Sequence, residues 1–304
     1  MQVYDPLSFD DYIKNLEKIG FQSTETGKAA FLLEKMLNDK EILTFFSFTA
    51  NLVASGLRGF IAKLAKEKKI DVIITTAGSI EHDVIKAFFD YEIGSFYEND
   101  VLLHKKGINR IGNIKVKNKA YILFEEICKK IFANYDDKKS FSPSELSRDF
   151  GSYIEKNAKK EKREKSFLYW CYKNDVPIFC PGVIDGALGL QIYFYMQKNK
   201  DIYIDYRSDM KKLADIVMNA KKTGGIILGG GISKHHLIGA NLLRGGLDYA
   251  IYITTATDLD GSLSGAKTNE AVSWGKISEK GLHLTIYGEA TIIFPLLLKK
   301  AKLI

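Results

Sequence analysis

The residues whose types and spacing could do chemistry lie in Asn269-Glu-Ala-Val-Ser-Trp-Gly-Lys276, above all the lysine that ends it. Lys276 follows Trp274 and Gly275, and it comes after Glu270 in a stretch with few other charges. An amine that is held beside an indole and partly removed from water loses its proton more easily. Because only a neutral amine attacks an imine or carbonyl carbon, the segment predicts a lysine that forms a Schiff base. The alternatives are a solvated surface charge for Lys276 and a core side chain for Trp274.

A second candidate segment follows the apolar run 225–228, where Gly229-Gly-Gly231 opens an expected helix. Glycines at such a position let backbone amides approach a pyrophosphate near the helix N-terminus. The pattern is weak by itself, because the full GxGxxG motif is absent. His235 and His236 follow in the same helix, where adjacent side chains point roughly 100° apart. They make a poor chelating pair, and no metal site is predicted.

Short apolar strands alternate with amphipathic helices along the chain. This order predicts an α/β fold with a doubly wound, mostly parallel, Rossmann-like sheet and helices on both faces. Ligands bind such sheets beyond the carboxyl ends of the strands, so each candidate motif is expected just after a strand, in one crevice. We expect one domain, residues 1–304, with residues 1–19 as an N-terminal helical arm. Residues 96–118 are expected to be irregular, and residues 140–147 to form a loop. The expected strands are 42–48, 71–76, 176–179, 225–228, 249–254 and 284–287.

Composition narrows the function classes. The formal net charge is +7, and much of the excess lies in the run Lys156 to Lys165. Glutamates are spaced within this run as on a solvated helix, and no aromatic residues interleave to stack on bases, so nucleic-acid binding is not favoured. No segment is apolar enough to span a bilayer, and the first residues do not read as a secretory signal. Cys128, Cys171 and Cys180 lack metal-ligand spacing and are read as reduced thiols, which predicts a cytoplasmic protein.

Several strings of the chain closely resemble the deoxyhypusine synthase family. The most specific are Lys234-His-His236 and Val272-Ser-Trp-Gly-Lys276. The resemblance covers roughly residues 20–290, and it implies the fold above, NAD as cofactor and an alkyl-transferase activity on amines. Further matching strings are Gly20-Phe-Gln-Ser-Thr24, Thr75-Thr-Ala-Gly78, Cys180-Pro-Gly-Val-Ile-Asp-Gly186, Ile227-Leu-Gly-Gly-Gly231, Ala240-Asn-Leu-Leu-Arg244, Asp248-Tyr-Ala-Ile-Tyr-Ile253 and Asp260-Gly-Ser262.

The resemblance implies an NAD site. Ala50 stands where the family usually has serine, and Glu289 where it usually has aspartate. Asp185 matches a carboxylate that contacts the cofactor, and it is also placed to cap the helix that begins at Gly186; the two roles are compatible. The implied cofactor-binding residues are Ala50, Asn51, Leu52, Val53, Ala54, Thr76, Ala77, Gly78, Asp185, Gly230, Thr255, Ala256, Glu289 and Ala290.

The resemblance also implies an amine pocket, with Lys276 as the nucleophile and His235 as a hydrogen-bonding or proton-transfer group. His82, Leu190 and Leu263 stand where the family has acidic residues. Burying an ammonium group without a partner costs several kcal/mol, so these replacements weaken the expected hold on a triply charged amine. His236 is expected to pack beneath the site. The implied substrate-binding residues are Glu81, Asp260, Gly261, Ser262, Glu270 and Trp274, with Trp274 as a wall against a methylene chain.

The reaction implied by the resemblance is NAD-dependent transfer of a 4-aminobutyl group from spermidine to a lysine of translation initiation factor 5A. The departures leave two alternatives open. One is a related enzyme with another amine donor or acceptor, of the homospermidine synthase type. The other is a non-catalytic partner subunit of an active relative. The resemblance further implies a homotetramer, in which the helix expected over residues 5–18 covers a neighbour's site or packs on its own subunit.

Overall fold

The structure, a computed structural model, describes residues 2–199 and 201–304. The chain divides into two compact units, which are described separately. Unit 1 comprises Met1–Phe48, Lys69–Ile74 and Lys211–Ile304. Unit 2 comprises Thr49–Lys68 and Thr75–Met210.

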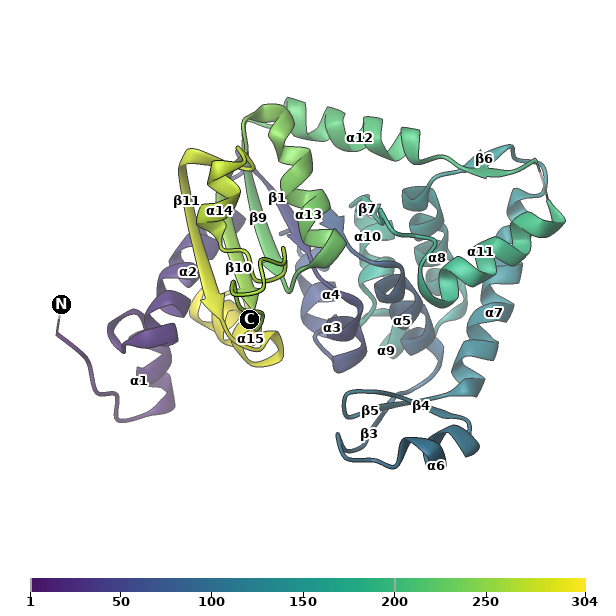
Figure 1. The fold of residues 1–304 in the computed structure, drawn as a ribbon, viewed down its shortest axis with the longest axis horizontal. Helices are drawn as coiled ribbons and strands as arrows, with labels where there is room; N and C mark the ends of the chain where they lie inside the picture. Colours follow the sequence, from purple (N-terminus) through teal and green to yellow (C-terminus); the bar gives the residue numbers. More distant parts are fainter. Residues whose placement is uncertain (1, 200) are drawn as a thin grey trace. The chain divides into compact units, whose positions relative to one another are not determined.

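Unit 1 is built on a parallel sheet (Figure 1) in which the strands follow the order β11-β10-β9-β1-β2. The inner strands are runs of apolar residues that are buried on both faces, as in β10, which is typical of a parallel sheet covered by helices on both sides. The strands are β1 (Ile42–Ser47), β2 (Val72–Ile74), β9 (Lys222–Leu228), β10 (Leu247–Thr254) and β11 (Ile277–Tyr287).

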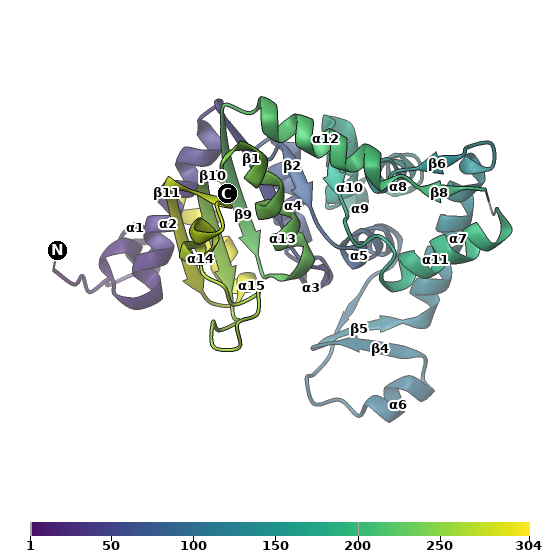
Figure 2. The same ribbon diagram turned by 45° about the horizontal axis from the view of Figure 1, so that its top comes forward.

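Helices cover both faces of this sheet. The long helix α2 packs on α15 and on the strands β1, β10 and β11, while α13 contacts β1, β2 and β9 and α14 contacts β10 and β11. Figures 1 and 2 show α13 and α14 on the face opposite to α2. The helices are α1 (Phe9–Lys14), η1 (Leu16–Lys18), α2 (Phe21–Asn38), α13 (Gly231–Ala240), η3 (Asn241–Arg244), α14 (Thr268–Ser273) and α15 (Ala290–Lys300), with α12 (Tyr206–Asn219) belonging to unit 1 from Lys211 onward.

Unit 2 is mainly helical. Helix α5 contacts α3, α7, α8, α10 and α11, and α10 also packs on α4 and α8. The helices are α3 (Ala50–Ser55), α4 (Arg58–Lys66), α5 (Ala77–Phe88), α6 (Asp100–Lys105), α7 (Asn118–Phe132), η2 (Ala133–Tyr135), α8 (Pro143–Asn157), α9 (Lys160–Arg163), α10 (Phe167–Asn174) and α11 (Gly186–Lys198). The strands are β3 (Glu92–Ile93), β4 (Ile108–Ile111), β5 (Ile114–Lys117), β6 (Ser140–Phe141), β7 (Ile178–Phe179) and β8 (Tyr203–Ile204).

The predicted fold class is confirmed, and the local differences have physical reasons. Residues 96–118 are not irregular: they form α6 and an antiparallel hairpin of β4 and β5, which pairs with β3. The segment after β1 forms two helices, α3 and α4, because Gly56 adopts a φ of 137° that ends the first. Residues 140–147 hold a short strand and the start of α8, which a capping box between Ser142 and Glu145 begins. The strand expected at 284–287 starts earlier, at Ile277.

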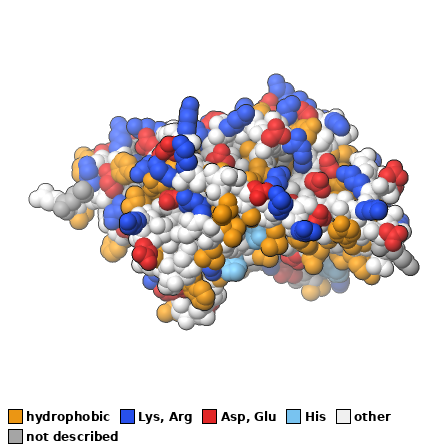
Figure 3. All heavy atoms as spheres, turned by 90° about the horizontal axis from the view of Figure 1, so that it is seen from above, with side chains coloured by type: hydrophobic (Ala, Val, Ile, Leu, Met, Phe, Trp, Pro, Cys, Tyr) orange, Lys and Arg blue, Asp and Glu red, His pale blue; other side chains and the backbone are white. Residues whose placement is uncertain are grey.

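Charge is mixed over the surface. Figure 3 shows Lys and Arg side chains spread over one face and interleaved with Asp and Glu, rather than gathered into one basic patch. The basic run at 156–165 does not form one helix, because α8 ends at Asn157 and α9 begins at Lys160. Within the described ranges, none of the helices combines the length and the apolar character that crossing a membrane requires.

Candidate active site

The predicted cofactor residues of unit 1 lie at the carboxyl ends of three neighbouring strands. Backbone hydrogen bonds link these ends: the Gly229 N–H donates to the Ile253 carbonyl at 2.8 Å, and the Gly288 N–H donates to the Thr254 carbonyl at 2.9 Å. The structure therefore gathers these residues along one edge of the sheet. They are Gly230 after β9, Thr255 and Ala256 after β10, and Glu289 and Ala290 after β11.

Two of these residues also have structural roles. A Cβ atom on Gly230 would lie 2.5 Å from the Cα atom of Ser264, so only glycine lets the loop of residues 257–267 cross the start of α13. Glu289 is the N-cap of α15, and its carboxylate accepts the Thr291 N–H at 3.0 Å. Glu289 thus fills at this helix start the capping role that aspartate commonly has.

Lys276 lies in a cavity of about 260 Å³ within unit 1. Its Nζ atom is 3.3 Å from Nε2 of His235 and 5.2 Å from the centroid of the Trp274 ring. Since α13 and α14 contact the same face of the sheet, side chains from both helices meet here. The cavity is lined by Lys234, His235, Ile238, Tyr252, Gly261, Leu263, Ala266, Lys267, Glu270, Ala271, Trp274 and Lys276.

The turn that carries Lys276 places it at the amino end of β11. Trp274 is the C-cap of α14, Gly275 turns the chain with a φ of 67°, and the Lys276 N–H donates to the Ala271 carbonyl at 2.9 Å. The Lys276 carbonyl in turn accepts the Leu247 N–H at the start of β10. The expectation that every motif follows a strand is thus wrong for this segment. Its side chain still reaches the cavity because α14 runs along the face of the sheet.

Trp274 forms a wall of the cavity but does not enclose it. The side chain is 66% exposed, and Lys276 is half-buried. Within the single chain, the exposed indole and the half-buried lysine show that Lys276 is only partly removed from water. Other apolar lining of the cavity comes from Ile238, Leu263, Ala266 and Ala271.

The predicted substrate residues of unit 1 separate into two groups. Glu270, Gly261 and Trp274 line the cavity, whereas Asp260 and Ser262 do not. The Asp260 carboxylate accepts the Ser262 N–H at 2.8 Å, and this contact holds the pKa of Asp260 below its usual value. Glu270 is therefore the one carboxylate among the cavity-lining residues.

Lys234 is a site residue that sequence reasoning missed. The side chain is 1% exposed, and its amine donates to the carbonyls of Leu263 at 2.7 Å and Ala266 at 2.8 Å. It also lies 4.4 Å from the centroid of the Tyr252 ring. Burial lowers the pKa of Lys234 to about 8, against the opposing charge of Glu270. Lys234 thus fixes the loop that forms one side of the cavity; the available signal was a lysine on an otherwise apolar helix face.

In unit 2 the predicted residues gather near the first turns of three helices. Ala50 to Ala54 form the body of α3, Thr76 is the N-cap of α5, and Asp185 is the N-cap of α11. Gly78 packs directly on α3, since a Cβ atom there would lie 2.8 Å from the Cβ atom of Ala50. Helix α5 contacts both α3 and α11, so the three helix starts belong to one cluster.

Glu81 connects two of these helices. It is 6% exposed, and its carboxylate accepts the Leu188 N–H at 3.0 Å in the first turn of α11. Burial raises the pKa of Glu81, while the amide hydrogen bonds from Leu188 and Ala187 oppose this rise. Asp185 makes no side-chain capping bond to α11, so the capping role considered for it is wrong.

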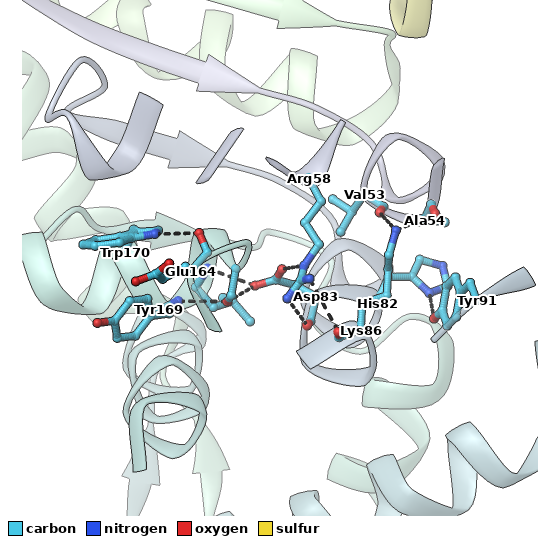
Figure 4. A network of polar contacts seen from close by, with 12 residues as sticks. Val53, Ala54, Arg58, His82, Asp83, Lys86, Tyr91, Glu164, Tyr169 and Trp170 are labelled. Carbon is cyan, nitrogen blue, oxygen red and sulfur yellow. Dashed lines mark hydrogen bonds and ion pairs between the residues drawn. The ribbon is translucent and has the colours of Figure 1, made fainter. Parts of the chain in front are cut away.

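A buried polar network fixes the positions of α3 and α5 (Figure 4). Asp83 is fully buried, forms an ion pair with Arg58, and accepts the Ser166 hydroxyl at 2.6 Å. Lys86 donates to the carbonyls of Val53 at 2.9 Å and Ala54 at 2.8 Å, at the end of α3. The sequence analysis did not identify Arg58, Asp83 and Lys86. Charged residues at otherwise apolar helix positions could have indicated a buried polar network. These three residues hold the segment that carries five predicted cofactor residues.

Three residues stand where the family has acidic residues, and they differ in their surroundings. His82 is 5% exposed, its Nδ1 atom is 2.8 Å from the Tyr91 hydroxyl, and burial lowers its pKa to about 4. The histidine is therefore neutral near pH 7. Leu190 is 58% exposed on α11, and Leu263 lines the cavity. Burial also lowers the pKa of His236, which is half-buried.

Comparison with known proteins identifies the family of this chain. The sequence model of the deoxyhypusine synthase family matches residues 11–301. A relative from Methanocaldococcus jannaschii, named "probable deoxyhypusine synthase", is 47% identical over 96% of this chain and 92% of its own length. A relative of the same name from Thermococcus kodakarensis is 45% identical over 97% of this chain and 91% of its own length.

The fold is shared with a solved protein. The crystal structure of a deoxyhypusine synthase candidate from Entamoeba histolytica superposes with a TM-score of 0.71 at 24% identity, over 99% of this chain and 96% of that one. At this identity the similarity concerns the fold alone. The assignment rests on the family match and on the two relatives of near-equal length: the chain belongs to the deoxyhypusine synthase family, a family of transferase enzymes.

Proposed function

We propose that this chain transfers an aminoalkyl group through an imine on Lys276 with NAD as cofactor, and that it is a deoxyhypusine synthase. The proposed donor is spermidine, which gives a 4-aminobutyl group, and the proposed acceptor is a lysine of translation initiation factor 5A. The observation that carries the proposal is the pairing of the Lys276 amine with His235, 3.3 Å apart, in a cavity that also holds Glu270.

The roles of the chain's own residues follow from this pairing. His235 accepts a proton from Lys276, and the neutral amine then attacks the carbon of the oxidised donor. A C–N bond forms to Nζ as the other nitrogen departs, and His235 returns a proton to the leaving amine. The acceptor lysine later attacks the same carbon and frees Lys276. The redox chemistry is what NAD supplies when bound, namely removal of a hydride from the carbon beside the donor nitrogen and its return to the product.

The residues that would hold NAD suit an anionic ligand. Four of the five helices that carry predicted cofactor residues at their start, α3, α5, α11 and α13, lack side-chain N-caps, whereas the fifth, α15, is capped by Glu289. Uncapped first turns leave amide groups available to a pyrophosphate. The tight contact between Gly78 and Ala50 leaves no room for a larger side chain beside one of these turns.

A second candidate function is the same transfer reaction with a different amine as donor or acceptor. Glu270 is the one carboxylate that lines the cavity, and Leu263 adds an apolar wall. A donor with fewer positive charges than spermidine, such as putrescine or agmatine, would need fewer carboxylate partners. A homotetramer, a cytoplasmic location and a single catalytic domain over residues 1–304 remain part of the proposal, as does the assignment of the predicted cofactor and substrate residues.

Borohydride trapping tests the proposal. The protein would be incubated with NAD and with spermidine, putrescine or agmatine in turn, reduced, and digested for peptide mass spectrometry. We expect an adduct on Lys276 whose mass identifies the transferred group. Lys276→Arg should abolish the adduct. The matched control is Lys267→Arg, because Lys267 lines the same cavity but pairs with Asp258 at 2.6 Å; this variant should keep the adduct.

Two other outcomes decide against parts of the proposal. NAD binding without an adduct from any of the three amines would rule out the imine mechanism. An adduct on Lys276 without transfer to translation initiation factor 5A from the same organism would favour the second candidate, with a free amine as acceptor.

A further inference from the structure

Helix α3 is short, and its position depends on side chains from outside it. It spans only the six residues Ala50–Ser55, and Gly56 ends it with a φ of 137°. A helix of this length holds about two of its own i→i−4 hydrogen bonds and is marginally stable by itself. Since Ala50 to Ala54 are predicted to bind the cofactor, the groups that fix the ends of α3 set the shape of this part of the predicted site.

Both ends of α3 are held by α5. At the first end, a Cβ atom on Gly78 would lie 2.8 Å from the Cβ atom of Ala50. At the second end, the Lys86 amine donates to the carbonyls of Val53 at 2.9 Å and Ala54 at 2.8 Å (Figure 4). Carbonyls in the last turn of a helix have no partner within the helix, and a positive charge there is favourable. Lys86 thus supplies both hydrogen bonds and charge at this end.

Lys86 forms no ion pair among the described residues. The two carboxylates whose charges act on it are engaged elsewhere, because Asp83 pairs with Arg58 and Asp90 pairs with Lys162. Helix α3 has no ionisable side chain. The Lys86 side chain is half-buried, and its burial, together with the charge of Arg58, lowers the pKa of Lys86 to about 8.

The other titratable groups around Lys86 are uncharged near neutral pH. His82 lies one turn earlier on α5, and the ring centroid of Tyr91 is 5.4 Å from the Lys86 amine. Burial lowers the pKa of His82 to about 4 and raises the pKa of Tyr91 above its usual value. Lys86 is therefore the group of this cluster whose charge changes near pH 8.

We propose that Lys86 is a positioning residue for the cofactor site: its charged amine holds the end of α3 in the conformation in which Ala50 to Ala54 bind NAD. The inference rests on the proposed function, which assigns these residues to NAD. Lys86 acts through α3 and is not itself a predicted cofactor residue. Loss of its charge at high pH weakens the hold, because a hydrogen bond from a neutral amine is weaker than one from an ammonium group.

The test compares Lys86→Met with Lys69→Met. Lys69 is also half-buried, and its amine donates to the Leu37 carbonyl at 3.3 Å and to the Asn38 side chain at 2.9 Å. The same kind of contact is therefore removed from the end of α2, a helix that carries no predicted cofactor residue. The dissociation constant of NAD would be measured by calorimetry at pH 7 and pH 9.5. A third variant, Lys86→Arg, keeps the charge at both pH values.

We expect Lys86→Met to raise the dissociation constant of NAD about 10-fold at pH 7, the range of a hydrogen bond from a charged group. In the wild type this constant should rise between pH 7 and pH 9.5, and the rise should be smaller in Lys86→Met because the charge is already absent. Lys86→Arg should bind NAD nearly as the wild type does at pH 7 and lose less affinity by pH 9.5. Lys69→Met should match the wild type at both pH values.

The inference is overturned if Lys86→Met binds NAD as the wild type does, or if Lys69→Met weakens NAD binding to the same degree. If Lys86→Met does not fold, the wild type and Lys86→Arg decide, and an identical dependence of their NAD affinity on pH overturns the inference. Failure of the proposed function looks different, because the wild-type protein itself would then bind no NAD at either pH.

Discussion

The amine of Lys276 lies 3.3 Å from Nε2 of His235, although the two residues are 41 positions apart in the chain. His235 projects from α13, and Lys276 follows the turn after α14, so the packing of these two helices on one face of the sheet sets the distance. At this distance a proton can pass between the two groups. An experiment can distinguish a proton-transfer role of His235 from a role in binding the substrate alone.

The first prediction concerns this pair. His235→Ala should slow adduct formation on Lys276 about 100-fold or more, because the lysine loses its proton acceptor. NAD affinity should stay unchanged. The rate of trapping would be measured against pH: in the variant it should recover as the pH rises, since bulk base then deprotonates the lysine. An equal loss at all pH values would contradict proton transfer and indicate that His235 only orients the substrate.

The second prediction concerns the close approach of α5 to α3. Gly78→Ala should destabilise the protein by about 1–3 kcal/mol, because the new Cβ atom would meet the Cβ atom of Ala50 at 2.8 Å. The double variant Ala50→Gly with Gly78→Ala removes the clash and should be more stable than the sum of the single changes allows. Urea unfolding of all four proteins gives the coupling energy. Additive effects would show that the helices can move apart without cost.

The third prediction concerns His82 and pH. Its folded-state pKa of about 4 lies below the ordinary 6.5, so between these values the unfolded chain binds more protons than the folded one. Stability that is present above pH 6.5 is therefore lost as the pH falls toward 4, by about 2 kcal/mol at pH 5. The comparison is urea unfolding at pH 5 and pH 7.5.

His82→Gln should reduce the difference in unfolding free energy between the two pH values. His104→Gln is the matched control, because His104 is exposed and should leave the difference as it is in the wild type. If His82→Gln and the wild type lose the same free energy at pH 5, another group is responsible.

The fourth prediction concerns the buried pair of Arg58 and Asp83. Asp83→Asn should lower the unfolding free energy by about 3–5 kcal/mol, because it leaves the guanidinium group buried without its counter-charge. The matched control is Asp100→Asn in the pair with Arg110, where the Asp100 side chain is 64% exposed. That change should cost less than about 1 kcal/mol. Similar losses for both variants would mean that the buried pair is better solvated than its exposure indicates.

Local patterns in the sequence located the buried strands of the parallel sheet. The apolar runs in β1, β9 and β10 are bounded by glycine or polar residues, so their carboxyl ends were predicted to within one residue, whereas β9 and β10 begin earlier than predicted. The hairpin of β4 and β5 was missed because its strands are short and half-exposed, and its stability depends on pairing rather than on an apolar run. The division into two units was also absent from the prediction, since no linker composition marks it.

The sequence by itself determined the fold class, the family and the identities of Lys276, His235, Glu270 and Trp274 as candidate site residues. Their chemistry is a property of residue type and local spacing, which a sequence displays directly. Only the tertiary structure decided that Lys234 and Tyr252 share their cavity, that Asp260 and Ser262 do not, and that Trp274 stays open to solvent. Burial and hydrogen bonding between distant segments depend on how helices pack on the sheet, and local sequence carries no direct record of those contacts.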